Sequence, residues 1–271
     1  MYAGIVKRFL TIIVALALVI STSVIVRVKA DFAKAKEELR LQLENYNQVH
    51  QEYTAAKAKY QQFKTLPTET EAFLTMRRAM AARTQVMQAY FALLAEKLVE
   101  TGSTPDDVRK SLNSEIEAEK SYLTDFRRKA LGAANLQEAE NLSSEFGEKQ
   151  EGWQNITTKY KGVIFTSALV NIAERSSTLV EKTSQTLAAT HAITNITDLN
   201  LREEKIELGK NKISESLELS KGSQDSFLTI KFDSKSFEAK RAENDAKEKA
   251  NDAKETLVEA IKAIAEAARD F

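Results

Sequence analysis

The chain has 271 residues, and its 39 basic side chains are balanced by 39 acidic ones, so it lacks the positive field of a nucleic-acid-binding protein. No residue is a cysteine, which excludes disulfide bonds, thiolate metal ligands and cysteine nucleophiles. Eight glycines and two prolines are few helix breakers for this length, and 29% of the residues are charged, so the composition predicts an all-α protein with long helices.

Residues 9–26 form an apolar run, FLTIIVALALVISTSVIV, that contains no charged side chain. As a helix this run would be about 27 Å long, close to the hydrocarbon core of a bilayer at about 30 Å. It follows Lys7 and Arg8, as in an export signal, but it is longer than the apolar region of a cleaved signal peptide. We therefore expect residues 1–30 to be a signal anchor that spans the membrane once. Cleavage after Ala30 is the alternative.

Basic residues on both sides of the apolar run leave its orientation open. Arg27 and Lys29, which follow the run, favour a cytoplasmic body under the positive-inside rule. A short N-terminus that begins with a basic pair is the usual arrangement for export. We expect the body to lie outside the cytoplasm.

Residues 31–65 repeat apolar side chains at alternating steps of three and four, which is the heptad pattern of a coiled coil. Nothing between Val26 and Asp31 breaks a helix, so we expect the anchor to continue into this segment as a stalk. Nine of the ten heptad positions are apolar or aromatic: Phe32, Ala35, Leu39, Gln42, Tyr46, Val49, Tyr53, Ala56, Tyr60 and Phe63.

A proline marks the boundary between the first two helices of the body. Leu66-Pro67 is expected to end the first helix, because the residue before a proline is disfavoured in the α region. Thr68 or Thr70 is the expected N-cap of a second helix over residues 69–101. We interpret the methionines of this helix as core filler rather than as an adaptable binding surface. They are Met76, Met80 and Met87.

The next boundary has a glycine, a threonine and a proline in suitable order. Gly102 suits the C′ position of the second helix, Thr104 an N-cap, and Pro105 the first residue of a third helix over residues 105–131. Helices of similar length with short connections pack antiparallel. We therefore assign residues 31–132 to an antiparallel three-helix unit.

Residues 133–271 are expected to complete the bundle with further long helices. Residues 136–192 look too long for one ordinary helix, and the glycines between 147 and 152 predict a kink. The apolar run at 163–173 is too short to span a membrane, so we interpret it as core. A heptad pattern covers Phe146, Lys149, Trp153, Ile156, Tyr160, Val163, Ser167 and Val170.

The last part of the chain predicts two more helices, which gives the body five or six in all. The first is expected over residues 198–221, and the second, with an alanine-rich face, over residues 236–270. Side chains near 222–236 alternate like those of a strand, but no partner strand is predicted. We expect a loop there, or a continuation of the preceding helix.

The sequence assembles no catalytic, cofactor-binding or metal site, and we expect no enzyme activity. His50 and His191 lack the glutamate three residues earlier that a di-iron bundle uses, and no His-Glu-x-x-His zinc motif is present. The carboxylates occur at helical spacing beside basic residues, as on solvated helix faces. Three sequons would accept glycans only in an exported body; their asparagines are Asn141, Asn155 and Asn195.

We interpret the chain as a membrane-anchored, non-enzymatic helical scaffold of the cell envelope. It would contact the membrane through residues 9–26, and a protein partner or a second copy through its helical seams. A ligand-binding or ligand-sensing ectodomain is one alternative, because an anchor leading into antiparallel helices is similar to the input domains of chemoreceptors. With reversed topology, the chain would be a membrane-tethered cytoplasmic coiled-coil scaffold, similar in outline to septum-associated helical proteins. A sensor predicts a polar cavity, whereas a scaffold predicts an exposed apolar patch.

Overall fold

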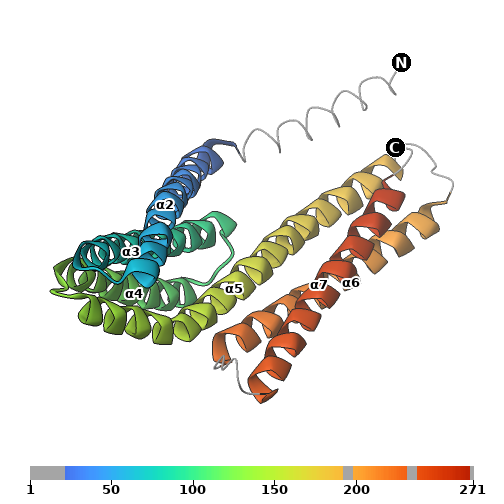
Figure 1. Ribbon diagram of the computed structural model, residues 1–271. Coiled ribbons are helices and arrows are strands. Elements are labelled where there is room, and N and C mark those ends of the chain that lie inside the picture. Colours follow the sequence, from blue (N-terminus) through green and yellow to red (C-terminus); the bar gives the residue numbers. More distant parts are fainter. Residues whose placement is uncertain (1–21, 192–197, 231–236, 269–271) are drawn as a thin grey trace. The chain divides into compact units, whose positions relative to one another are not determined.

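The computed structural model describes residues 22–191, 198–230 and 237–268, and Figure 1 shows their arrangement as a ribbon. Within these ranges every regular element is a helix and no residue is in a strand, which confirms the predicted all-α class. The helices are α2 (Thr22–Phe63), α3 (Leu66–Thr101), α4 (Asp106–Gly132), α5 (Leu136–His191), α6 (Leu199–Thr229) and α7 (Phe237–Ala267).

The predicted membrane anchor, residues 9–26, lies outside the described residues except for its last five positions. Those positions open α2, which starts at Thr22 and continues without a break into the predicted heptad segment. The expected continuity between the end of the apolar run and the stalk is therefore confirmed. Among the described residues, none of the helices combines the length and hydrophobicity that a membrane span requires.

The start of α3 differs from the prediction. The helix begins at Leu66, and its N-cap is Thr65, whose carbonyl accepts the Glu69 N–H at 3.0 Å. The Thr68 hydroxyl accepts the Thr65 N–H at 3.1 Å, in the manner of a capping box. The prediction of Thr68 or Thr70 as the N-cap was wrong, because a proline is tolerated inside the first turn, where its missing N–H has no helical acceptor.

The turn between α3 and α4 agrees with the prediction at its glycine but not at its threonine. Gly102 has a φ of 77°, as expected for a left-handed C′ residue. The Thr104 hydroxyl does not cap α4; it lies 2.8 Å from the Ser167 hydroxyl of α5. The first turn of α4 instead carries Asp106 and Asp107, whose charges complement the helix dipole.

The chain divides into two compact units. The first unit holds α2, α3 to Glu100, α4 from Asn113 and α5 to Phe146. The second holds Thr101–Leu112, the remainder of α5, α6 and α7. Both α4 and α5 therefore contribute residues to each unit.

In the first unit, α2 packs antiparallel to α3. Lys59 pairs with Glu71 at 3.3 Å, whereas the Phe32 ring, near the other end of the described side chains of α2, lies 4.8 Å from Lys97 Nζ. Aromatic contacts join the remaining helices, since the Phe146 ring centroid of α5 lies 5.1 Å from that of Phe126 in α4 and 4.6 Å from the Arg83 guanidinium of α3. Of the predicted core methionines, Met76 and Met80 are buried and Met87 is half-buried.

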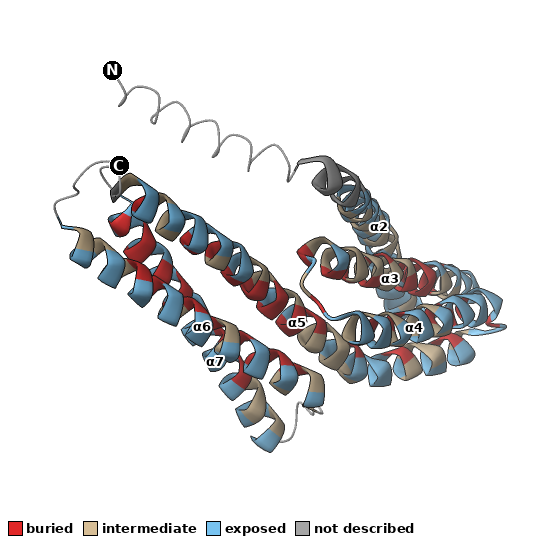
Figure 2. Cartoon of the chain, turned by 180° about the vertical axis from the view of Figure 1, so that it is seen from behind, coloured by how far each residue is buried: buried red, intermediate tan, exposed pale blue. Residues whose placement is uncertain are grey.

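In the second unit, α6 and α7 pack closely and antiparallel, and buried residues recur along α5, α6 and α7 (Figure 2). The buried hydroxyls of Ser216 and Ser223 each donate to an α7 carbonyl at 2.7 Å, those of Ala253 and Ala246 respectively. Small residues at the contact permit this approach. The shared core consists of Leu169, Ala173, Val180, Leu187, Ile206, Ile213, Ala253, Leu257, Ala260, Ile264 and Ala267.

Two helices are longer than the sequence suggested. α5 is one continuous helix of 56 residues, whereas this stretch was expected to be too long for one ordinary helix; the kink near residues 147–152 stays a prediction. The helix α6 continues to Thr229, so the expected loop is absent over residues 222–229 and the alternative of a continued helix is confirmed there. Residues 231–236 lie outside the described part of the chain.

Candidate interaction surface

The heptad pattern predicted along α5 becomes buried interior rather than an interface. Trp153, Tyr160, Val163 and Val170 are all buried, as is Ser167. These residues lie on the side of α5 that packs inside the second unit, so they are not available to a partner.

A second row on α5 stays at the surface. It also steps by four and three residues, and it contains Phe165, Ile172 and Leu179, whose exposed fractions are 40%, 44% and 55%. The interpretation of the run at 163–173 as core was therefore wrong for Phe165 and Ile172. We call this set the α5 outer row. Its members are Lys161, Phe165, Ala168, Ile172, Arg175, Leu179 and Lys182.

Polar contacts on another side of α5 fix which face points outward. The buried Ser167 hydroxyl lies 2.8 Å from the Thr104 hydroxyl and accepts a hydrogen bond of 2.8 Å from Gln224 Nε2 of α6. One turn later, Asn171 Nδ2 donates to the Thr101 carbonyl at 3.0 Å. Buried polar groups are costly to leave unpaired. These contacts therefore oppose rotation of α5, and the outer row remains exposed.

The charge of the α5 outer row is entirely basic. In the described part of the chain, neither Arg175 nor Lys182 has an ion-pair partner. Glu174, which follows Ile172 by two positions, lies about 200° around the helix from it. Its carboxylate accepts a hydrogen bond from the Ser103 hydroxyl at 3.4 Å. The apolar side chains of the row are thus accompanied by cations and not by carboxylates of their own helix.

Other surface charges of the second unit are paired between helices. Lys205 Nζ of α6 lies 2.8 Å from a Glu266 carboxylate oxygen of α7, and Lys212 Nζ lies 3.2 Å from one of Glu259. The hydrogen bond to each glutamate raises the pKa of the lysine. These cations are engaged within the unit, which distinguishes them from Arg175.

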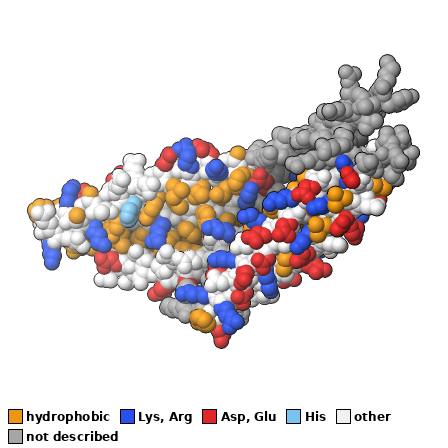
Figure 3. All heavy atoms as spheres, turned by 90° about the vertical axis from the view of Figure 1, so that its right-hand side faces the viewer, with side chains coloured by type: hydrophobic (Ala, Val, Ile, Leu, Met, Phe, Trp, Pro, Cys, Tyr) orange, Lys and Arg blue, Asp and Glu red, His pale blue; other side chains and the backbone are white. Residues whose placement is uncertain are grey.

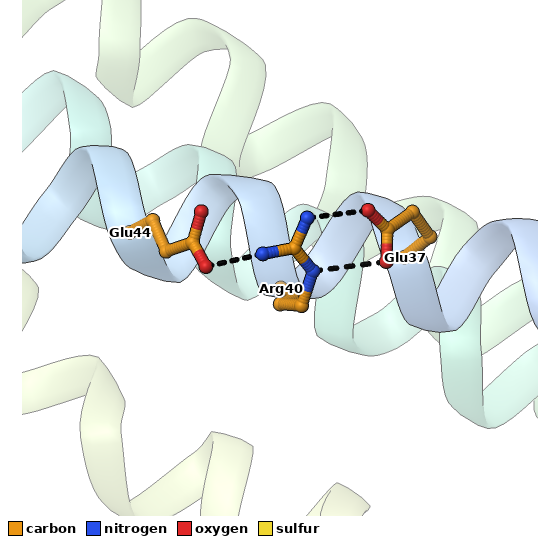
Figure 4. A network of polar contacts seen from close by, with 3 residues as sticks. All are labelled: Glu37, Arg40 and Glu44. Atoms are coloured by element: carbon orange, nitrogen blue, oxygen red, sulfur yellow. Dashed lines mark hydrogen bonds and ion pairs between the residues drawn. The ribbon is translucent and has the colours of Figure 1, made fainter.

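The first unit carries its own charge network on α2, where Arg40 lies between Glu37 and Glu44 (Figure 4). Arg40 Nε and Nη2 donate to the two carboxylate oxygens of Glu37 at 2.9 and 2.6 Å. The hydrogen bonds from Arg40 lower the pKa of Glu37 and raise the pKa of the guanidinium. This i,i+3 and i,i+4 arrangement is the solvated charged face that the sequence predicts.

The predicted coiled-coil seam of α2 is only partly covered. Of its ten positions, Ala56 is buried, Phe63 is exposed and the others are half-buried. His50, beside this seam, is exposed, and its ring stacks on Tyr46 with centroids 5.3 Å apart. The α2 seam therefore closes within the chain, against α3, on one side only.

Charged and apolar side chains both lie on the molecular surface. In the face that Figure 3 displays, hydrophobic side chains gather into a patch on one part, beside a histidine, and most acidic side chains lie with basic ones on another part. Apolar groups on a surface are ordinary when they are scattered, whereas a gathered set marks an interaction site.

The residues considered for chemistry do not come together as a metal site. The described residues contain no group of three or more histidine, aspartate or glutamate side chains arranged to hold a metal ion. Of the sequon asparagines, Asn141 is exposed and Asn155 is half-buried, both within α5. Asn195 and the His191 side chain lie outside the described part of the chain.

Comparison of the chain with protein-family models, with curated proteins and with solved structures finds no match.

Proposed function

We propose that the chain is a membrane-anchored scaffold of the cell envelope, which docks another component through a helix face and performs no chemistry itself. The observation that carries the proposal is the α5 outer row, in which large apolar side chains recur every seven residues on the surface. A helix that only fills a core exposes polar groups at these positions. Exposed apolar residues at heptad spacing suit contact with another helix.

The anchor is residues 9–26, which cross the membrane once, with the antiparallel helical body outside the cytoplasm. Support comes from the uncharged run itself and from the unbroken helix that leaves it at Thr22. A continuous helix of this kind extends the first unit away from the bilayer. α2 has 42 residues, which corresponds to about 63 Å at the rise of an α-helix.

Protease accessibility tests the anchor and its orientation. A tag is placed after Phe271, and intact cells are treated with protease before membranes are separated from soluble protein. We expect the tag in the membrane fraction and digested without lysis. Protection until lysis would refute the exported body and favour the cytoplasmic scaffold, and recovery of the full-length chain in the soluble fraction would refute the anchor.

Site-specific photo-crosslinking tests the docking face. A photoreactive residue replaces Ile172 in the α5 outer row, and a matched residue replaces Leu208, a 45% exposed leucine of α6. In the native cells we expect a defined protein adduct from position 172 and none of the same size from position 208. Equal adducts from both positions, or none from either, would refute docking through the α5 outer row.

A further inference from the structure

The α5 outer row alternates apolar and basic side chains along three heptads. Phe165, Ile172 and Leu179 occupy one set of positions, and Arg175 and Lys182 follow the last two of them by three residues. This pattern defines which side chains a complementary helix would need. A second helix with the same repeat would place apolar side chains against the apolar positions and acidic side chains against the basic ones.

We propose that the α5 outer row binds an amphipathic helix of another protein whose exposed seam alternates apolar and acidic residues. This inference rests on the proposed scaffold function and names the class of its partner. Residues 161–182 span about 32 Å along the helix axis, so the partner contributes about three heptads.

The positive charge of the α5 outer row favours a helix of another protein, rather than a second copy of this chain, as its partner. Two α5 outer rows brought together would carry only positive charge, and like charges across an interface oppose association. An acidic partner instead supplies the carboxylates that Arg175 and Lys182 lack among the described residues. Attraction between opposite charges also raises the rate of encounter at low salt.

The narrow width of the α5 outer row favours a protein helix, rather than a lipid surface, as its binding partner. A helix that lies in a membrane interface presents a broad apolar face, whereas the α5 outer row is one side chain wide. On one side it is bordered by the buried residues Leu169 and Ser176. On the other it is bordered by the half-buried Ile164 and then by the polar residues Asn171 and Thr178. A single apolar line fits between the side chains of one facing helix.

Peptide binding to the purified full-length chain in detergent tests the proposal. The probes are two labelled 21-residue helical peptides with leucine at one set of heptad positions and either glutamate or lysine at the other. Fluorescence anisotropy gives the affinity of each. We expect the glutamate peptide to bind at least tenfold more tightly than the lysine peptide at low salt, and this difference to shrink as salt screens the charges.

Charge reversal makes the test specific for the α5 outer row. In the double variant Arg175→Glu, Lys182→Glu, the affinity for the glutamate peptide should fall tenfold or more, and the affinity for the lysine peptide should rise. Leu179→Ser should lower the affinity for the glutamate peptide about tenfold, since it removes an apolar contact that binding would bury. The matched control, Leu208→Ser on α6, should leave both affinities unchanged. Circular dichroism checks that each variant remains helical.

Three results would overturn the proposal. The first is unchanged peptide preference after charge reversal. The second is sedimentation of the chain as a dimer that Leu179→Ser dissociates, which would assign the row to a second copy. The third is burial of a dye at Thr178→Cys, a unique label because the chain has no cysteine, by anionic nanodiscs without peptide. Membrane fractionation and crosslinking at position 172 report on the scaffold function independently of these outcomes.

Discussion

Gly162 of α5 is the position where the structure gives the sharpest prediction about stability. A Cβ atom added there would lie 2.3 to 2.6 Å from three atoms of the Phe227 ring, which is itself buried. The ring belongs to α6, so the close approach holds two helices of the second unit together. Gly152 on the same helix is the matched control, since an added Cβ there meets nothing within 4 Å.

The two substitutions to alanine separate helix propensity from packing. Gly152→Ala should stabilise the second unit by about 1 kcal/mol, the propensity difference between glycine and alanine in a helix. Gly162→Ala gains the same stability from helix propensity, but it forces the Phe227 ring to move. Overpacking of this kind costs about 1–3 kcal/mol of stability. Propensity cancels between the variants, so Gly162→Ala should be less stable than Gly152→Ala by about 1–3 kcal/mol.

Thermal unfolding of the full-length chain in detergent measures this difference. Trp153 is the single tryptophan and lies in the second unit, so its fluorescence reports on the unit that carries both glycines. A difference of this size corresponds to a gap in Tm of roughly 2–12 °C. The double variant Gly162→Ala, Phe227→Leu should lose less stability than the two single changes together. Equal Tm values for the two glycine variants would refute the close contact.

Three further predictions concern polar contacts. Ser216→Ala should destabilise the second unit by about 1 kcal/mol, because its hydroxyl donates to the Ala253 carbonyl, whereas Ser220→Ala should be neutral or stabilising, since its buried hydroxyl has no partner among the described residues. Denaturant titration compares the two, and an equal loss would contradict the assignment. Gln224→Leu should cost about 1–3 kcal/mol by removing the donor to Ser167, and it should increase hydrogen exchange in α5 near that residue. Arg40→Gln should raise the pKa of Glu37, measured by NMR titration, because Arg40 holds that pKa below its ordinary value. The small stability from this pair is present above the ordinary glutamate pKa and is lost as the pH falls through the lowered pKa. An unchanged Glu37 pKa in Arg40→Gln would contradict the network.

Local sequence signals determined the class of the fold and several of its boundaries. Few breakers and a repeat of three and four residues indicate helices because that spacing lines one side of a helix. Gly102 marks a helix end because glycine adopts a positive φ without steric cost. The alanine-rich face predicted within residues 236–270 is buried in α7 at Ala246, Ala250 and Ala253. Each of these inferences depends on residues within one or two helical turns.

The tertiary structure decided which seams are covered. The run at 163–173 is apolar on several sides of α5, so its composition alone does not say that Val163 is buried and that Phe165 is exposed. That choice depends on Thr104 and Gln224, which are distant in sequence and hold Ser167 inward. The same long-range contact explains why the Thr104 hydroxyl does not cap α4. Sequence periodicity predicts that a helix has an apolar side, but the partners packed against it fix its rotation and leave the α5 outer row at the surface.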